Sequence, residues 1–147
     1  MQFVIHVSTL IADEKGRFLL VREKKEINYD KLNLPGGHLE FKEGIMEGAM
    51  REVKEETCVD VELKNLASIF YDWSEHHYIQ FFFIGKIIGG GIPKANLEHV
   101  KGIEWRSAEE IGRFTSNEMI NLNKIKKVIK NFQEGKLGSL ELIRRAE

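Results

Sequence analysis

The sequence predicts an α+β (mixed α/β) fold in which a mixed β-sheet lies sandwiched between helices. Strand-like segments precede and follow one strongly amphipathic helix, and a second long helix closes the pattern, an order typical of layered α/β proteins. The chain has 147 residues and an ordinary globular composition. Because this length suits one domain, we expect a single domain over residues 1–147, with the tail 135–147 assigned to no element.

The first third of the chain predicts a hairpin and a short extended segment. Phe3 to Ala12 is rich in β-branched residues, which favour a strand. A polar turn with one glycine follows, and Arg17 to Arg22 is expected to return as the second strand of a hairpin. After a polar loop, Leu32 to Leu34 should be extended, because a residue before proline avoids the helical region.

The remaining elements follow from periodicity. The first strong helix is expected over Ile45 to Thr57, with an apolar face made by Ile45, Met46, Ala49, Met50 and Val53. After it we expect one or two strands over 59–71, an aromatic-rich strand over 78–88, a strand over 102–106, a helical turn over 108–112, and a second long helix over 117–133 that turns Ile125, Val128, Ile129 and Phe132 inward.

Charge and cysteine usage exclude several classes. The net charge is −1, so the basic excess of a nucleic-acid-binding protein is absent. Cys58 is the one cysteine, which excludes an intrachain disulfide and suits a reducing cytoplasm. The N-terminal residues lack the basic region of a secretory signal, and the longest apolar run, around 79–88, is too short for a bilayer. We therefore expect a cytoplasmic protein.

The most informative feature is a crowd of glutamates on the first helix. Three of them, Glu52, Glu55 and Glu56, occupy an arc beside the apolar face, and Glu56 overlaps that face. Like charges at this spacing repel, and a partly buried carboxylate without a partner is costly. A divalent cation resolves both problems, since carboxylates are natural ligands of magnesium, manganese and calcium. The simpler reading is a solvated acidic face that pairs with lysines.

The segment from Gly37 to Val59 resembles the Nudix box, the signature of the Nudix hydrolases. That pattern is G-x5-E-x7-R-E-U-x-E-E-x-G-U, where U is a bulky aliphatic residue. Eight of its nine specified positions match here: Gly37, Glu43, Arg51, Glu52, Val53, Glu55, Glu56 and Val59. The preceding Pro35-Gly36 also looks like the family's lead-in, and the resemblance in element order extends from about Val4 to Phe132.

Cys58 stands where the family has a glycine that ends the helix. Glycine there suits a left-handed cap, and a cysteine in that conformation would carry about 1 kcal/mol of strain. We therefore expect either a strained terminus or a different helix end. A small packing residue is the preferred role of Cys58, and a nucleophile is the alternative.

The resemblance implies a Nudix fold and a metal-dependent hydrolase that cleaves the diphosphate of a nucleoside diphosphate linked to another group. It implies Mg²⁺ (or Mn²⁺) held by Glu52 and Glu56, with Glu55 as a further ligand or supporting acid and the carbonyl of Gly37 completing the site. Water would attack phosphorus, and Glu52, Glu55 and Glu56 are the candidate catalytic residues.

The resemblance also implies a structural pair, Glu43 and Arg51, that braces the loop against the helix. Many Nudix enzymes take one more acid from a later loop. Glu98 is the first candidate and Glu104 the second, while Glu40 is a candidate ligand near Gly37. For each of these three glutamates, the alternative interpretation is an ordinary solvated residue.

Candidate substrate-binding residues are Tyr29, His77 and Phe81. Tyr29 precedes the box in a loop and His77 lies in a turn, where plain surface roles compete with base stacking. Phe81, Phe82 and Phe83 alternate across a strand, so one or two belong to the core and the other is free to face substrate.

Two alternatives remain open beside a hydrolase. One is a non-catalytic Nudix domain that binds a nucleotide or a protein partner, although such domains typically lose acids of the box. The other is an isomerase of isoprenyl diphosphates, which depends on a catalytic cysteine and a modified box. The partner expected is a small-molecule nucleotide, with no nucleic acid or membrane. A homodimer is expected from family habit and from the apolar tail residues Leu140, Leu142 and Ile143.

Overall fold

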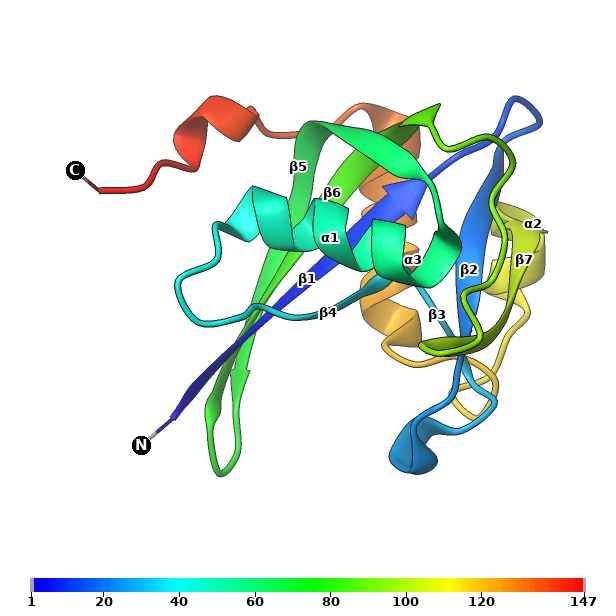
Figure 1. Ribbon diagram of the computed structural model, residues 1–147, viewed down its shortest axis with the longest axis horizontal. Coiled ribbons are helices and arrows are strands. Elements are labelled where there is room, and N and C mark those ends of the chain that lie inside the picture. The colour runs from blue at the N-terminus through cyan, green and yellow to red at the C-terminus, as the bar shows by residue number, and fades with distance from the viewer. Residues whose placement is uncertain (1, 147) are drawn as a thin grey trace.

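The computed structural model describes residues 2–146 and places seven strands and three α-helices among them. In chain order the elements are β1 (Phe3–Ile11), β2 (Arg17–Glu23), the 3₁₀ turn η1 (Glu26–Asn28), β3 (Leu32–Asn33), β4 (Gly36–His38), α1 (Ile45–Thr57), β5 (Asp60–Trp73), β6 (His77–Gly89), β7 (Val100–Ser107), α2 (Ala108–Gly112), α3 (Leu122–Glu134) and the 3₁₀ turn η2 (Leu140–Leu142). Figure 1 shows the chain, and the expected α+β class is confirmed.

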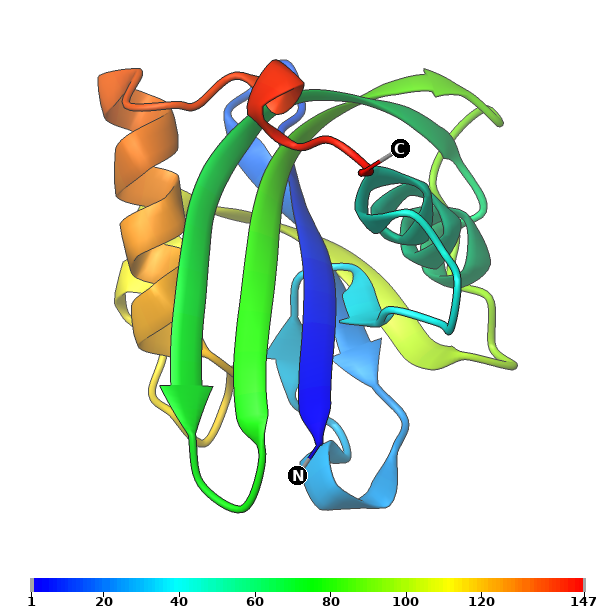
Figure 2. The same cartoon turned by 90° about the vertical axis from the view of Figure 1, so that its left-hand side faces the viewer.

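The strands form two sheets. The larger sheet has the order β4-β1-β6-β5 and is mixed, because β1 runs parallel to β6 and antiparallel to β4. The smaller sheet has the order β3-β2-β7 and is antiparallel. Figure 2 shows the larger sheet standing between α1 on one side and α3 on the other.

Alternation along the strands divides the core into two clusters. Val7 of β1 and Phe83 of β6 pack in the cluster that includes Ala49 and Val53 of α1. Leu10 lies on the opposite face of β1 and packs in the cluster that includes Ile125 and Val128 of α3. Each helix therefore covers one face of the larger sheet, and α1 is held over β1 and β5.

The prediction that β1 and β2 pair as a hairpin is wrong, because the two strands do not form a continuous hydrogen-bonded ladder. Its turn forms, with the Asp13 side chain accepting hydrogen bonds from the backbone N–H groups of Lys15 and Arg17. Beyond one bridge between Ala12 and Phe18, however, the two strands separate into different sheets. β1 finds its partners in β4 and β6, which lie far along the chain, and local periodicity carries no information about that choice.

The second long helix begins at Leu122 and not near Asn117 as expected. The backbone before it bonds to β3 instead: the Leu32 N–H donates to the Glu118 carbonyl, and the Ile120 N–H donates to the Leu32 carbonyl, each at 2.8 Å. Asn121 then adopts a left-handed conformation with φ 55°, from which the helix starts. These sheet-like bonds use the groups that an earlier helical turn would need.

The strand after α1 is a single one. β5 runs through register irregularities from Asp60 to Trp73, two residues beyond the expected end.

The tail packs on the molecule itself, since Leu140 and Ile143 contact the α1-side cluster while Leu142 stays exposed. Within residues 2–146 no helix is long and apolar enough to cross a membrane.

α1 ends as the family pattern requires, although a cysteine occupies the cap. Cys58 is left-handed, with φ 63° and ψ 16°, and its N–H donates to the Lys54 carbonyl at 3.0 Å. A side chain in this region costs roughly 1–2 kcal/mol relative to glycine. The helix thus keeps its geometry and carries the strain.

We predict that Cys58→Gly raises the free energy of unfolding by about 0.5–1 kcal/mol, because relief of left-handed strain exceeds the added entropy of a glycine in the unfolded chain. Urea unfolding measures the change. Cys58→Ala, which keeps the Cβ atom, is the matched control and should leave the midpoint almost unchanged. Equal midpoints for the two variants would contradict strain at this cap.

Candidate functional site

The candidate site lies where α1 meets β4. Ala49 and Val53 of α1 are buried in the core. Their burial holds the adjoining side of the helix against the glycine-rich strand β4. Two contacts define the junction: Glu56 reaches the backbone of Gly36, and Glu52 lies against Gly37. The helix register that buries the apolar stripe therefore also delivers these carboxylates to β4.

Glu56 is a buried acid with one hydrogen-bond donor. It is 6% exposed, and the Gly36 N–H donates to its Oε1 at 2.8 Å. Burial, opposed by the Gly36 hydrogen bond and reinforced by the negative charges of Glu23 and Glu52, raises the pKa of Glu56 to about 9. Without a cation this carboxyl is therefore neutral at physiological pH.

Two glycines allow close approaches at this junction, to a side chain at Gly37 and to the backbone at Gly36. A Cβ atom on Gly37 would lie 2.5 Å from Oε1 of Glu52, so the missing side chain is what lets that carboxylate rest against the backbone. A Cβ atom on Gly36 would lie 2.3 Å from the Val7 carbonyl oxygen. The pair of glycines allows β1, β4 and α1 to converge at one point.

Arg51 binds two other acids of the helix and one acid of the loop before it. Its guanidinium holds Glu43 through two hydrogen bonds, of 2.5 and 3.0 Å, and reaches Glu52 and Glu55 at 3.1 Å each. It also donates to the His38 carbonyl, so the β4 end, the following loop and α1 are tied together. The hydrogen bond from Arg51 lowers the pKa of Glu43, whereas burial raises the pKa of Glu52.

The donors fit a hard divalent cation. Glu52 and Glu56 present carboxylate oxygens whose charged forms are disfavoured by burial, and a nearby cation would remove that penalty. Within residues 2–146, no three His, Cys, Asp or Glu side chains converge closely enough to hold an ion by themselves. A cation here would complete its shell with backbone carbonyls, water or substrate oxygens, as magnesium usually does.

The other candidate acids occupy different surroundings. Glu98 is exposed in the loop after β6, which docks on the end of α1 because the Asn96 N–H donates to the Glu56 carbonyl. Glu104 forms ion pairs with Arg22 and Arg106. Glu40 is exposed, with its carboxylate 3.7 Å from the Arg51 guanidinium.

The three candidate substrate residues lie in separate places. The Tyr29 ring lies under the Lys101 ammonium, 4.2 Å from it. His77 stacks on Phe3 at the exposed start of the larger sheet. Phe81 is half-buried on the α1 side, while Phe82 and Phe83 are buried in the core. The structure does not gather the three rings around the glutamates.

Sequence reasoning missed two charges next to the site. Glu23 is the last residue of β2 and Lys25 lies two residues later. Both act on Glu56: the charge of Glu23 raises its pKa and that of Lys25 lowers it. Their stretch reads only as a polar surface loop, so no local signal marks them. Their position depends on how the smaller sheet packs, which is a non-local property.

Comparison with known proteins gives consistent matches. A family model of the NUDIX domain matches residues 2–130. The chain is 28% identical over 135 residues to an ADP-ribose pyrophosphatase of Methanocaldococcus jannaschii, covering 87% of this chain and 72% of that protein. It is 30% identical over 86 residues to an 8-oxo-dGDP phosphatase of Danio rerio, covering 58% of this chain and only 26% of that longer protein. A solved NUDIX hydrolase of Nitrosomonas europaea superposes with a TM-score of 0.84 at 25% identity, covering 99% of this chain and 98% of that one.

We predict that Glu56→Gln stabilises the metal-free protein increasingly as pH rises. The folded-state pKa of about 9 lies above the unfolded value, so the proton on Glu56 contributes stability that is present at low pH and lost as pH rises through about 9. Glutamine cannot ionise and can still accept from Gly36. Between pH 5 and pH 9 the stability difference should grow by about 2–4 kcal/mol.

Urea unfolding in a chelator at several pH values measures this difference. Glu47→Gln, on the exposed side of the same helix, is the control and should show no such trend. A difference between Glu56→Gln and wild type that stays constant with pH would contradict the assignment of Glu56 as a buried neutral acid.

Proposed function

The chain belongs to the NUDIX family, and from this membership we propose that it is a metal-dependent hydrolase of a nucleoside diphosphate linked to another group. Water attacks one phosphorus of the diphosphate, the bridging P–O bond breaks, and two phosphorylated products leave. The observation that carries the proposal is the buried Glu56 carboxyl, bonded to Gly36 and beside Glu52, on the box helix.

We propose that Glu52, Glu55 and Glu56, with the Gly37 carbonyl, hold Mg²⁺ or Mn²⁺, and that Glu98 is the further ligand from the later loop. A bound cation would neutralise phosphate oxygens and lower the pKa of water. Glu52 is the residue we assign to orienting water or taking its proton, because Arg51 fixes its carboxylate at 3.1 Å. Glu43 has a structural role, since both its oxygens bind Arg51.

The similar ADP-ribose pyrophosphatase and 8-oxo-dGDP phosphatase support cleavage of a phosphoanhydride in a small nucleotide. They differ in substrate, so they leave the group attached to the diphosphate open. We also propose that the enzyme works in the cytoplasm, on the ground that its single cysteine needs no oxidising compartment.

We predict that Glu56→Gln lowers kcat/KM at least about 10²–10⁴-fold on whichever nucleotide the wild type cleaves, since loss of a catalytic carboxylate has effects of this size. The measurement is product identity and rate on a panel of nucleoside triphosphates, ADP-ribose, nucleotide sugars, dinucleoside polyphosphates and capped RNA ends, with Mg²⁺ and with Mn²⁺. Glu47→Gln should match wild type. Equal rates for Glu56→Gln and wild type would contradict the catalytic assignment of Glu56. No cleavage of any compound would instead favour a nucleotide-binding or partner-binding domain.

We propose that two copies associate through an exposed apolar face, not through the tail. Phe3, His77 and Trp73 form one row across three strands, and Tyr71 lies in the next row, stacked near Trp73. Phe3, Tyr71 and Trp73 are 58%, 76% and 65% exposed, and Figure 2 shows no helix over this half of the sheet. With flanking aliphatic residues, two such faces would bury about 1,000 Å², close to what a specific interface needs.

We predict a dimer at tens of micromolar in sedimentation equilibrium. The double substitution Tyr71→Ser and Trp73→Ser should convert it to a monomer, because it removes most of the exposed aromatic area. Ile92→Ser, which removes an 87% exposed side chain from a different loop, is the control and should leave the dimer intact. A wild-type mass of one chain at this concentration would refute the interface.

A further inference from the structure

A row of polar side chains crosses three strands of the larger sheet. The register pairs His6 of β1 with His38 of β4 on one side and with Gln80 of β6 on the other. Residues paired directly across strands share a face, so the three side chains lie next to each other. The two imidazole rings meet edge to face, with centroids 4.2 Å apart.

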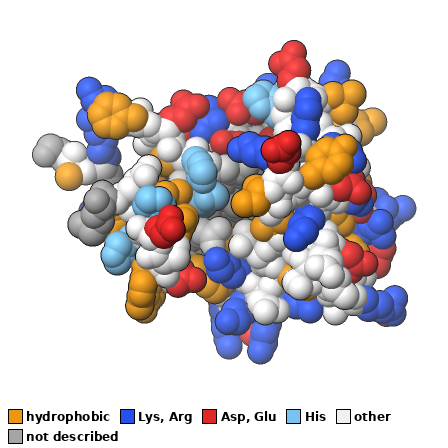
Figure 3. All heavy atoms as spheres, turned by 90° about the horizontal axis from the view of Figure 1, so that it is seen from below, with side chains coloured by type: hydrophobic (Ala, Val, Ile, Leu, Met, Phe, Trp, Pro, Cys, Tyr) orange, Lys and Arg blue, Asp and Glu red, His pale blue; other side chains and the backbone are white. Residues whose placement is uncertain are grey.

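This row faces the side of the sheet that α3 covers. Lys124, in the first turn of α3, donates from Nζ to Oε1 of Gln80 at 2.6 Å. Further along the same face Leu10 and Phe82 are buried in the core, so the row marks the point where the core ends. Figure 3 shows histidine side chains gathered beside a hollow near the centre of this end of the molecule.

The row begins at His38, the residue after Gly37 of the glutamate site, and the positive charge beside the row comes from Lys124. Burial, then the His38 neighbour and the positive charges of Lys124 and Lys25, lower the pKa of His6 to about 4. Burial, and after it the charge of Lys25, lowers the pKa of His38, and Lys25 also opposes the raised pKa of Glu56. Lys25 therefore lies within electrostatic reach of both the row and the acids.

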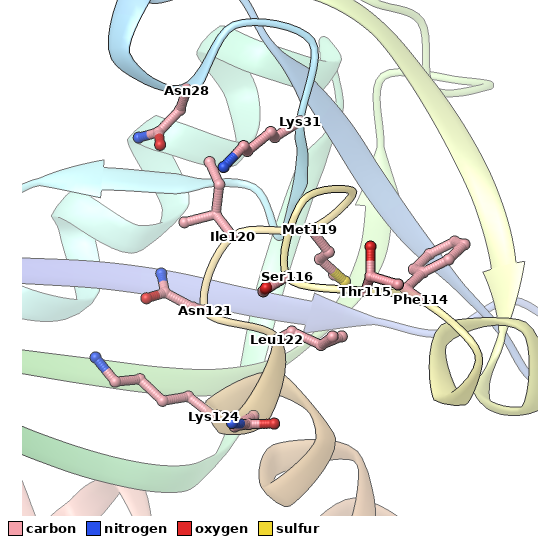
Figure 4. A pocket seen from close by; sticks show the side chains of 11 residues that line it. Asn28, Lys31, Phe114, Thr115, Ser116, Met119, Ile120, Asn121, Leu122 and Lys124 are labelled. Atoms are coloured by element: carbon pink, nitrogen blue, oxygen red, sulfur yellow. The ribbon is translucent and has the colours of Figure 1, made fainter.

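A pocket lies beside the row and includes Lys124 in its lining. This pocket has a volume of about 580 Å³, and none of the residues that line it is acidic. In Figure 4 the side chains of Asn28, Lys31, Asn121 and Lys124 extend to the same side of the pocket, while Phe114 and Met119 lie at the other. The side next to the polar row thus presents hydrogen-bond donors and ammonium groups.

An acid-lined site beside a donor-rich one suits an extended anion. A cation at the glutamates would bind the diphosphate that is cleaved, and a further phosphate would meet the lysines. Charge-assisted hydrogen bonds from ammonium to phosphate are the strong kind. A neutral sugar in the same place would leave both ammonium groups without a charged partner.

We propose that Lys124, Lys25 and Gln80, with His6 and His38 as the floor, bind a phosphate of the substrate beyond the cleaved diphosphate. The chain then prefers nucleotides with three or more phosphates over those whose diphosphate carries a neutral sugar. This inference rests on the proposed hydrolysis at Glu52 and Glu56 for its catalytic part.

The test compares Lys124→Met with Lys127→Met, which removes an exposed lysine from the same helix. Lys25→Met, in an exposed loop, is a second variant that leaves α3 untouched. KM and kcat are measured for ATP and for ADP-ribose with Mg²⁺, and the affinity of metal-free protein for inorganic tripolyphosphate is measured by calorimetry. Loss of one charge-assisted hydrogen bond should raise KM for ATP, and Kd for tripolyphosphate, about 10-fold in both test variants. KM for ADP-ribose, and all values for Lys127→Met, should stay within about twofold of wild type.

Two results would overturn the subsite. One is unchanged tripolyphosphate affinity in Lys124→Met and Lys25→Met. The other is a wild-type kcat/KM for ADP-ribose that equals or exceeds that for ATP. If Glu56→Gln is inactive while either result is found, the hydrolase proposal stands and only the subsite fails. If Glu56→Gln stays as active as wild type, the assignment of catalysis to Glu56 fails, and tripolyphosphate affinity alone decides the subsite.

Discussion

The contact between the buried Glu56 carboxyl and the Gly36 N–H is the constraint on which the rest of the site depends. It fixes the rotation of α1 relative to β4, because the apolar stripe of the helix and this acid cannot both be buried in any other register. Gly36 itself must be a glycine, since its Cβ atom would enter space held by the Val7 carbonyl, and a Cβ atom at Gly37 would displace the Glu52 carboxylate. One hydrogen bond thus links helix, strand and core.

The acids around this contact differ in whether a positive side chain binds them. Arg51 binds Glu43 of the preceding loop and Glu52 and Glu55 of α1, so three acids share one guanidinium. Glu56 has no such partner among residues 2–146, and burial leaves it neutral until a cation arrives. Arg51 and Glu43 thus join the loop to the helix, and the neighbouring Glu56 carboxyl has, among the described residues, no ion pair with a positive side chain that would compete with a metal ion. Beyond this carboxyl lies the polar row of His6, His38 and Gln80, with the Lys124 ammonium donating to Gln80.

Sequence patterns predicted the local parts of this arrangement well. The bounds of α1 agree with the periodicity, and the offset of Glu56 towards the apolar face was visible in the spacing alone. Patterns failed where partners are distant. They could not reveal that β1 pairs with β4 and β6, that backbone bonds to Leu32 delay α3, or that His6, His38 and Gln80 lie side by side. Each depends on strand register, which the local sequence does not encode.

The most direct measurement of the central claim is a calorimetric titration of metal-free protein with Mn²⁺ at pH 7.5, in two buffers with different ionisation enthalpies. A buried neutral Glu56 that must ionise to bind the cation predicts that wild type and Glu47→Gln bind Mn²⁺ and release protons. Glu56→Gln should bind at least about 10-fold more weakly and release fewer protons. Equal Mn²⁺ affinity and equal proton release in Glu56→Gln and wild type would contradict the account.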